Sequence, residues 1–275
     1  MSSECVLISK HVSFGGNVEF YSHKSTFTQT NMKFAIFLPW CSNENHVPAL
    51  VYLAGLTCTE DTFMIKSGAQ KYAAKHGLAL ICPDTSPRDA GIDGEDSDWD
   101  FGTGAGFYLD AEIEPWSKNY RMYSYITKEL IEIIDNAFDI DINKLGIFGH
   151  SMGGHGALTI FLKNQDIFKS VSAFAPICNP MACPWGKKAF TNYLGQDTDK
   201  WKVYDACHLI ERYPTITDIL VDQGLADTFL KEQLYPQKLQ EACKKAGVSL
   251  NLRQHEGYDH GYYFISAFMD DHIAH

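Results

Sequence analysis

The sequence has a deficit of basic residues, no Cys-x-x-Cys pair and no long hydrophobic run. Lysine and arginine number 23 against 34 aspartate and glutamate residues, which gives a net charge of −11. This balance argues against nucleic acid or an anionic membrane as a partner. Without Cys-x-x-Cys spacing, the eight cysteines do not indicate a zinc or redox site. No apolar stretch approaches the roughly 20 residues that cross a bilayer.

The N-terminal stretch MSSECVLISKHV lacks the basic and apolar segments of a secretion signal. We therefore expect a cytoplasmic protein with reduced thiols, and we expect neither a cofactor nor a metal. The 275 residues are 45% hydrophobic, which is enough to bury a full core. Because no linker, repeat or low-complexity segment interrupts the chain, we expect one domain over residues 1–275.

Strand and helix patterns alternate from residue 49 onward, which predicts a mostly parallel sheet with helices on both faces. Before them, residues 12–23 and 32–40 alternate apolar and polar side chains and predict antiparallel strands. Helices are expected over several segments, including 64–77, 120–138 and 260–275. Two long insertions, 88–107 and 178–209, are expected to be irregular. Both follow predicted strands and should lie at the carboxyl edge of the sheet, where α/β sheets bind ligands.

A Gly-His-Ser-Met-Gly motif over residues 149–153 stands between a predicted strand and a predicted helix. This is the G-x-S-x-G turn of the α/β-hydrolase fold, which exposes the Ser151 hydroxyl as a nucleophile. The competing interpretation is a helix start capped by serine. His155 lies on the following helix and is expected to be structural, while His150 is expected to point away from Ser151.

Neither the glycines around Ser151 nor the acidic run that precedes them in the chain matches a phosphate-binding or calcium-binding motif. No lysine follows the glycines of 149–156, so a phosphate-binding P-loop is excluded. The acidic run 96–100 lacks the glycine and glutamate of a calcium loop, because Phe101 and Phe107 occupy those positions.

A nucleophilic serine needs a base and an orienting acid, which follow it in the order Asp/Glu and then His in this fold. His260 is the preferred base because it lies in a loop between the last strand and the last helix, with His255 as second choice. Asp227 is the preferred acid because it lies in the loop after a predicted strand, with Asp222 as second choice. His272 is expected at the surface.

The oxyanion hole is expected to use the backbone N–H groups of Met152 and Leu56. Cys58 lies two residues beyond Leu56, and we expect it near the pocket, either as an accessible thiol or as an inert buried one.

Several stretches together resemble the S-formylglutathione hydrolase (esterase D) family. They are GLTCTEDTF, GHSMGGHGAL, CPWGKKAF, VDQGLADTFL and YDHGYYFI, and the resemblance runs from about residue 20 to the C-terminus. It implies hydrolysis of the thioester S-formylglutathione to formate and glutathione, in formaldehyde detoxification, through an acyl-enzyme. The family's triad falls on Ser151, Asp227 and His260, its oxyanion loop on Leu56 and its thiol-sensitive cysteine on Cys58.

A formyl group is small, so bulky side chains such as Trp185 are expected to close the acyl pocket. The resemblance further suggests a homodimer. A general short-chain carboxylesterase or acyltransferase with the same machinery remains the alternative, and a non-catalytic binding protein on the same fold is a third.

Overall fold

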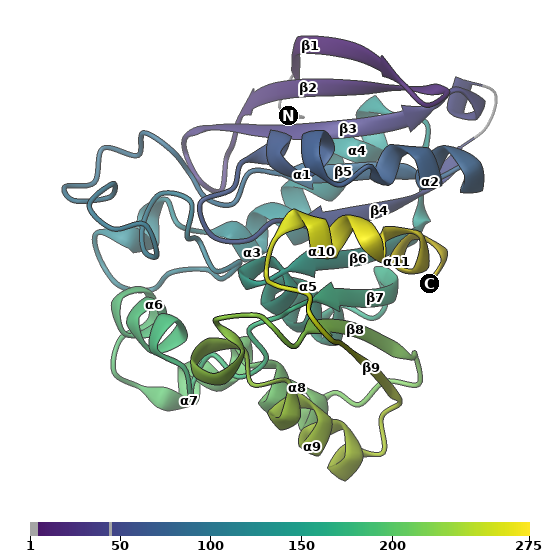
Figure 1. The fold of residues 1–275 in the computed structure, drawn as a ribbon. Coiled ribbons are helices and arrows are strands. Elements are labelled where there is room, and N and C mark those ends of the chain that lie inside the picture. The colour runs from purple at the N-terminus through teal and green to yellow at the C-terminus, as the bar shows by residue number, and fades with distance from the viewer. Residues whose placement is uncertain (1–4, 44–45) are drawn as a thin grey trace.

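The computed structural model describes residues 5–43 and 46–275, and its centre is a nine-stranded mixed sheet (Figure 1). The strands lie in the order β1-β2-β3-β5-β4-β6-β7-β8-β9. The first three are antiparallel, and β3 also pairs antiparallel with β5, whereas β5, β4 and β6 to β9 are parallel to one another. Their bounds are β1 Val6–Ser13, β2 Gly16–Lys24, β3 Asn31–Pro39, β4 Val47–Leu53, β5 Ala79–Pro83, β6 Ile140–His150, β7 Phe168–Phe174, β8 Ile219–Gly224 and β9 Leu250–His255.

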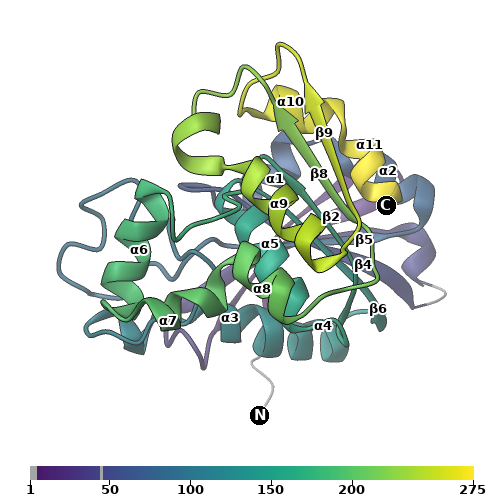
Figure 2. The same cartoon turned by 90° about the horizontal axis from the view of Figure 1, so that it is seen from below.

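Helices cover both faces of this sheet, as Figures 1 and 2 show from two directions. One face carries α1 Glu60–Lys66, α2 Ala69–His76, α10 Tyr262–Ala267 and α11 Met269–Ala274, and the other carries α3 Met122–Ser124, α4 Ile131–Ala137, α5 Met152–Lys163, α8 Ala206–Arg212 and α9 Pro236–Ala246. Because both faces are covered, β5 and β8 are buried along their whole length. The predicted α/β-hydrolase architecture is confirmed.

Some element boundaries differ from the sequence expectation. The strand predicted over 12–23 is the end of β1, a turn at Phe14–Gly15 with positive φ at both residues, and β2. The helix predicted over 64–77 is two helices, because Gly68 adopts φ 67° and starts α2 after α1 has ended. The terminal helix is likewise divided into α10 and α11 at Phe268.

The two insertions differ from each other in secondary structure. Residues 88–107 form only turns and isolated bridges, as expected for an irregular loop. Residues 178–209 were expected to be irregular, but they are largely helical, since buried aromatic residues anchor α6 Pro184–Leu194 to the body of the protein. The remaining short elements are α7 Thr198–Trp201, the turns η1 Trp40–Asn43, η2 Trp116–Lys118 and η4 Lys202–Tyr204, and the π-helical segments η3 Tyr125–Leu130 and η5 Leu230–Leu234.

The carboxyl ends of the parallel strands meet at one edge, on the left of Figure 1. Loops that leave β4, β6, β8 and β9 lie there, and both insertions extend from the same edge. None of the helices in the described residues is long and apolar enough to cross a membrane.

Candidate active site

Ser151 occupies a strained turn between the end of β6 and the start of α5. Its φ of 57° and ψ of −117° are sparsely populated by residues other than glycine. The turn is held by a 3.0 Å hydrogen bond from the Ser151 N–H to the Phe174 carbonyl. A side chain at Gly153 would overlap the Leu53 carbonyl, so the turn requires glycine there. Surrounding structure therefore compensates the strain, which is common at nucleophilic serines on this kind of turn.

His260 and Asp227 are paired directly. His260 Nδ1 lies 2.6 Å from Asp227 Oδ2, and the Asp227 side chain is fully buried. Asp227 also accepts hydrogen bonds from the Phe229 N–H (2.8 Å) and from Gln223 Nε2 (3.2 Å). With Nδ1 bonded to the carboxylate, Nε2 is the ring nitrogen left to exchange a proton with a substrate or nucleophile.

The loops that carry this pair are tied together. The Leu225 N–H bonds to the His255 carbonyl and the Ala226 N–H to the Tyr258 carbonyl, each at 2.9 Å. The ring of His260 packs against the ring of His150, with centroids 4.5 Å apart. Because His150 directly precedes Ser151, this contact places His260 beside the serine turn.

The loop after β4 lies against the same turn. A Cβ atom added at Gly55 would be 3.3 Å from Ser151 Cβ, so the loop approaches the serine closely. Within the described chain, no acceptor is bonded to the Leu56 N–H or to the Met152 N–H. Met152 is the first residue of α5, and its N–H is one of the donors that a helix leaves unsatisfied. Two N–H groups without an intramolecular acceptor, one on the loop after β4 and one at the start of α5, thus flank the turn that carries Ser151.

Comparison with known proteins identifies the family of this chain. A family model described as a putative esterase matches residues 25–275. The S-formylglutathione hydrolase of Rattus norvegicus is 54% identical over 271 residues, which cover 98% of this chain and 96% of the rat protein. The chain belongs to the S-formylglutathione hydrolase family.

Two further relatives support that membership and confirm the resemblance noted in the sequence. The S-formylglutathione hydrolase of Arabidopsis thaliana is 53% identical over 265 residues, covering 95% of this chain and 93% of the plant protein. A solved S-formylglutathione hydrolase structure from Agrobacterium tumefaciens superposes with a TM-score of 0.95 at 47% identity, covering 98% of this chain and 97% of its own.

In this family member the second-choice acid and base bond to each other. The buried Asp222 carboxylate lies 3.1 Å from His255 Nε2 and 3.1 Å from His272 Nε2, and it accepts two hydrogen bonds from Arg253. Burial raises the pKa of Asp222, but the hydrogen bonds from His272 and Arg253 outweigh it and hold the pKa well below its usual range. His272 was expected at the surface; it is buried, because α11 packs it on the sheet against Ser172 (2.8 Å).

The two histidines beside the serine in sequence are poorly suited to act as bases. His155 is buried with Nε2 3.1 Å from the Phe107 carbonyl, and burial lowers its pKa to about 4. Burial and the neighbouring His260 lower the pKa of His150 well below its usual value. Both therefore stay neutral at physiological pH. His150 nevertheless forms one wall for His260, a role that its place in the motif did not indicate.

Cys58 lies beside the oxyanion loop but lacks an activating environment. Its thiol is partly buried, and burial raises its pKa, an effect that the nearby Lys66 ammonium only partly offsets. A thiol with a raised pKa is a poor nucleophile at neutral pH, so Ser151 remains the better candidate. Cys58 forms no disulfide bond in the described structure.

Trp185 belongs to an aromatic wall that begins at His260. Phe229 contacts the His260 ring edge-on at 5.0 Å, Trp185 contacts Phe229 at 4.8 Å, and the exposed Trp99 contacts Trp185 at 5.6 Å. Phe229 and Trp185 thus form a continuous aromatic surface beside His260. Trp99 comes from the irregular insertion, so this contact joins the two insertions at the carboxyl edge.

Proposed function

We propose that this enzyme hydrolyses S-formylglutathione to formate and glutathione, with Ser151 as nucleophile. Membership of the S-formylglutathione hydrolase family, at more than half sequence identity to the rat protein, is the observation that carries the substrate. The pairing of the buried Asp227 carboxylate with His260, beside a strained serine turn, supports the mechanism. The same substrate places the reaction in a glutathione-rich compartment, in line with the expected cytoplasmic location.

In the proposed reaction His260 Nε2 accepts the Ser151 hydroxyl proton while Oγ bonds to the formyl carbon. The formyl oxygen becomes an oxyanion that receives hydrogen bonds from the Leu56 and Met152 N–H groups. The C–S bond then breaks, and His260 returns the proton to the departing glutathione sulfur. A thiol with a pKa of about 8.5 leaves readily near neutral pH.

Water completes the cycle. His260 removes a proton from a water molecule that attacks the formyl ester, and the bond to Ser151 Oγ breaks as the serine regains its proton. Throughout, Asp227 holds the imidazole orientation and stabilises its charged form. Its own position is secured by Gln223 and the Phe229 N–H.

The basic side chains near the site that could contact the two glutathione carboxylates are mostly engaged. Lys188 forms ion pairs with Asp98 (3.0 Å) and Asp100, and Arg88 pairs with Asp84 (2.7 Å). Lys187 is exposed and makes no ion pair within the described residues. We therefore expect the carboxylates to depend on few direct ion pairs.

The substrate assignment is tested with a panel of acyl thioesters and esters. We expect kcat/KM for S-formylglutathione to exceed that for S-butyrylglutathione by about 100-fold or more, because Phe229 and Trp185 restrict space near His260. Comparable values for formyl and longer acyl groups would instead make the protein a general short-chain carboxylesterase or acyltransferase.

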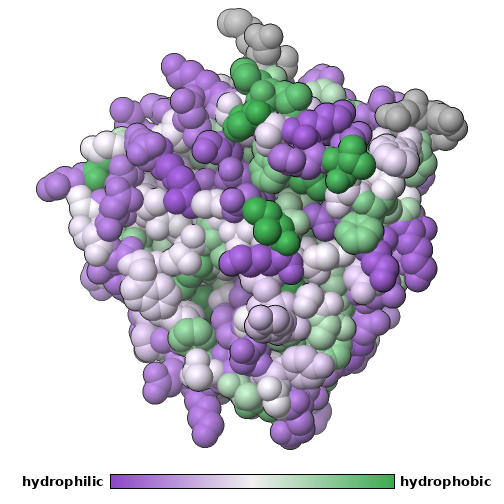
Figure 3. Space-filling model, turned by 45° about the horizontal axis from the view of Figure 1, so that its top comes forward, coloured by the Kyte–Doolittle hydropathy of each residue, from purple (hydrophilic) through white to green (hydrophobic). Residues whose placement is uncertain are grey.

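We also propose a homodimer that uses the outer edge of the sheet. β1 is an edge strand that exposes apolar side chains, including Val12 (73% exposed), and the neighbouring α1 exposes Ile65 (71%). Figure 3 views this side, where green hydrophobic groups lie among polar ones. A cavity of about 640 Å³ opens between β1, β2 and α1 and is partly lined by Ile8, Val12 and Ile65.

An apolar edge strand favours pairing with its own copy across a two-fold axis. Sedimentation analysis should then give twice the 30.9 kDa chain mass. The double substitution Val12→Asp and Ile65→Asp should produce monomers. A wild-type monomer at micromolar concentration would rule out this surface as a stable interface.

A further inference from the structure

The loop that presents the Leu56 N–H has an unusual backbone conformation. Thr57, directly after Leu56, adopts φ 68°, which is rare for a β-branched residue. Such a conformation persists only where the surrounding structure enforces it. The loop therefore needs contacts that hold it, and the direction of the Leu56 N–H depends on them.

One group of contacts comes from residues 104–108, at the end of the irregular insertion and directly after it. The Tyr108 hydroxyl donates to the Ala54 carbonyl at 2.8 Å, and the Thr57 N–H donates to the Gly104 carbonyl at 2.9 Å. The Ser86 hydroxyl in turn accepts a hydrogen bond from the Gly104 N–H at 2.8 Å. These contacts fix the beginning and the middle of the loop.

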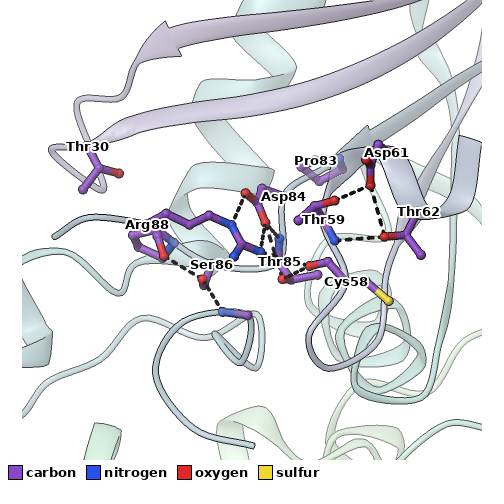
Figure 4. Close-up of polar contacts among 12 residues, drawn as sticks. Thr30, Cys58, Thr59, Asp61, Thr62, Pro83, Asp84, Thr85, Ser86 and Arg88 are labelled. Atoms are coloured by element: carbon purple, nitrogen blue, oxygen red, sulfur yellow. Dashed lines mark hydrogen bonds and ion pairs between the residues drawn. The ribbon is translucent and has the colours of Figure 1, made fainter. Parts of the chain in front are cut away.

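A second group converges on the carbonyl of Cys58, at the far end of the loop (Figure 4). The Thr85 hydroxyl donates to this carbonyl at 2.6 Å, and Arg88 Nη2 donates to it at 3.2 Å. Arg88 is itself held by a two-pronged pair with the buried Asp84, through Nε at 2.7 Å and Nη2 at 2.9 Å. Thr85 is fully buried, and its N–H also bonds to Asp84.

We propose that Thr85 and Arg88 are positioning residues, which fix the Cys58 carbonyl and thereby aim the Leu56 N–H at the acyl oxygen. The inference rests on the proposed function, because it assumes that Leu56 is an oxyanion donor. Asp84 contributes indirectly, because its ion pair with Arg88 fixes the plane of the Arg88 guanidinium group. Neither Thr85 nor Arg88 touches the reacting atoms in this arrangement.

The expected signature is a loss in kcat without a matching change in KM. A displacement of an ångström or less at an oxyanion donor weakens transition-state stabilisation more than it weakens substrate binding. Thr85→Val keeps the shape and removes the hydroxyl, and we expect kcat to fall about 30-fold with KM within about twofold. Thr85→Ser keeps the hydroxyl and should retain at least about a third of wild-type kcat.

Arg88→Lys keeps the positive charge but loses the planar fork that reaches Asp84 and Cys58 together. We expect kcat to fall about 10-fold, again with little change in KM. Arg88 is partly exposed, so this variant should fold even if a change at Thr85 does not. Together with Lys24 and Lys118, Arg88 also borders a polar cavity of about 450 Å³. If Arg88 instead bound substrate in this cavity, Arg88→Lys would raise KM.

The decisive experiment measures kcat and KM for S-formylglutathione and for p-nitrophenyl acetate, together with Ki for a trifluoromethyl ketone that forms a tetrahedral adduct with serine. Ki should rise in proportion to the loss in kcat/KM across the variants. Thr28→Val is the control, because it removes an equally buried threonine hydroxyl that bonds only to Thr30; it should change Tm and leave kcat unchanged.

Wild-type kcat in Thr85→Val and Arg88→Lys, or a rise in KM alone, would overturn the positioning role. Failure of the wild-type enzyme to hydrolyse S-formylglutathione would overturn the substrate assignment. The ester and the ketone would still test the positioning role in that case, because both require the same oxyanion donors.

Discussion

Replacing Ser151 with alanine is expected to lower kcat for thioester hydrolysis by about 10⁵-fold or more, because no other group beside His260 offers an activated nucleophile. Alanine carries the same Cβ as serine, so the strained turn at φ 57° should survive with Tm nearly unchanged. Turnover is followed by loss of the thioester, and Tm by thermal unfolding.

The matched control is Ser172→Ala, which removes a buried serine hydroxyl from β7 that bonds to His272 at 2.8 Å. This variant should lose stability and keep its kcat within about threefold of wild type, since the hydroxyl lies outside the proposed active site. Residual turnover above about 1% in Ser151→Ala would contradict the nucleophile assignment and direct attention to Cys58.

Features determined by local sequence were predictable, and features determined by distant contacts were not. The turn at Ser151 follows from small residues between a strand and a helix, and Gly153 faces the Leu53 carbonyl as the motif requires. The expected loop positions of Asp227 and His260 also follow from strand order. The chain order suggests that these two side chains form a pair. The 2.6 Å distance between His260 Nδ1 and Asp227 Oδ2 is seen only in the structure.

The errors have physical causes. The first part of β1, before residue 12, was not predicted. Its apolar side chains are exposed at the edge of the sheet, so they do not alternate with polar ones as they do in a half-buried strand. His272 looked like a terminal surface residue, yet Asp222 and Ser172 lie 50 and 100 residues away in sequence and provide its buried partners. The contacts of Thr85 and Arg88 with the Cys58 carbonyl link two loops across adjacent strands, a pairing that no local pattern indicates.

Asp222 lies in β8 and Asp227 lies in the loop after β8. We expect one of these buried aspartates to serve catalysis and the other to serve stability. Asp227→Asn is expected to lower kcat by about 10³- to 10⁴-fold, because an amide cannot stabilise the charged His260 and favours the wrong tautomer. Its size and burial are preserved, so the free energy of unfolding should change by about 1 kcal/mol or less.

Asp222→Asn should show the opposite pattern. Arg253 and His272 would lose a shared, fully buried carboxylate, and we expect the free energy of unfolding to fall by about 3 kcal/mol. Its kcat should stay within about threefold of wild type, because His260 bonds to Asp227 and not to Asp222. Urea unfolding and steady-state kinetics on both variants decide the matter: a large loss of kcat in Asp222→Asn with normal kcat in Asp227→Asn would exchange their roles. The paired design matters because each asparagine substitution alone could lower measured activity, one through the imidazole and the other through unfolding of the strand that positions it.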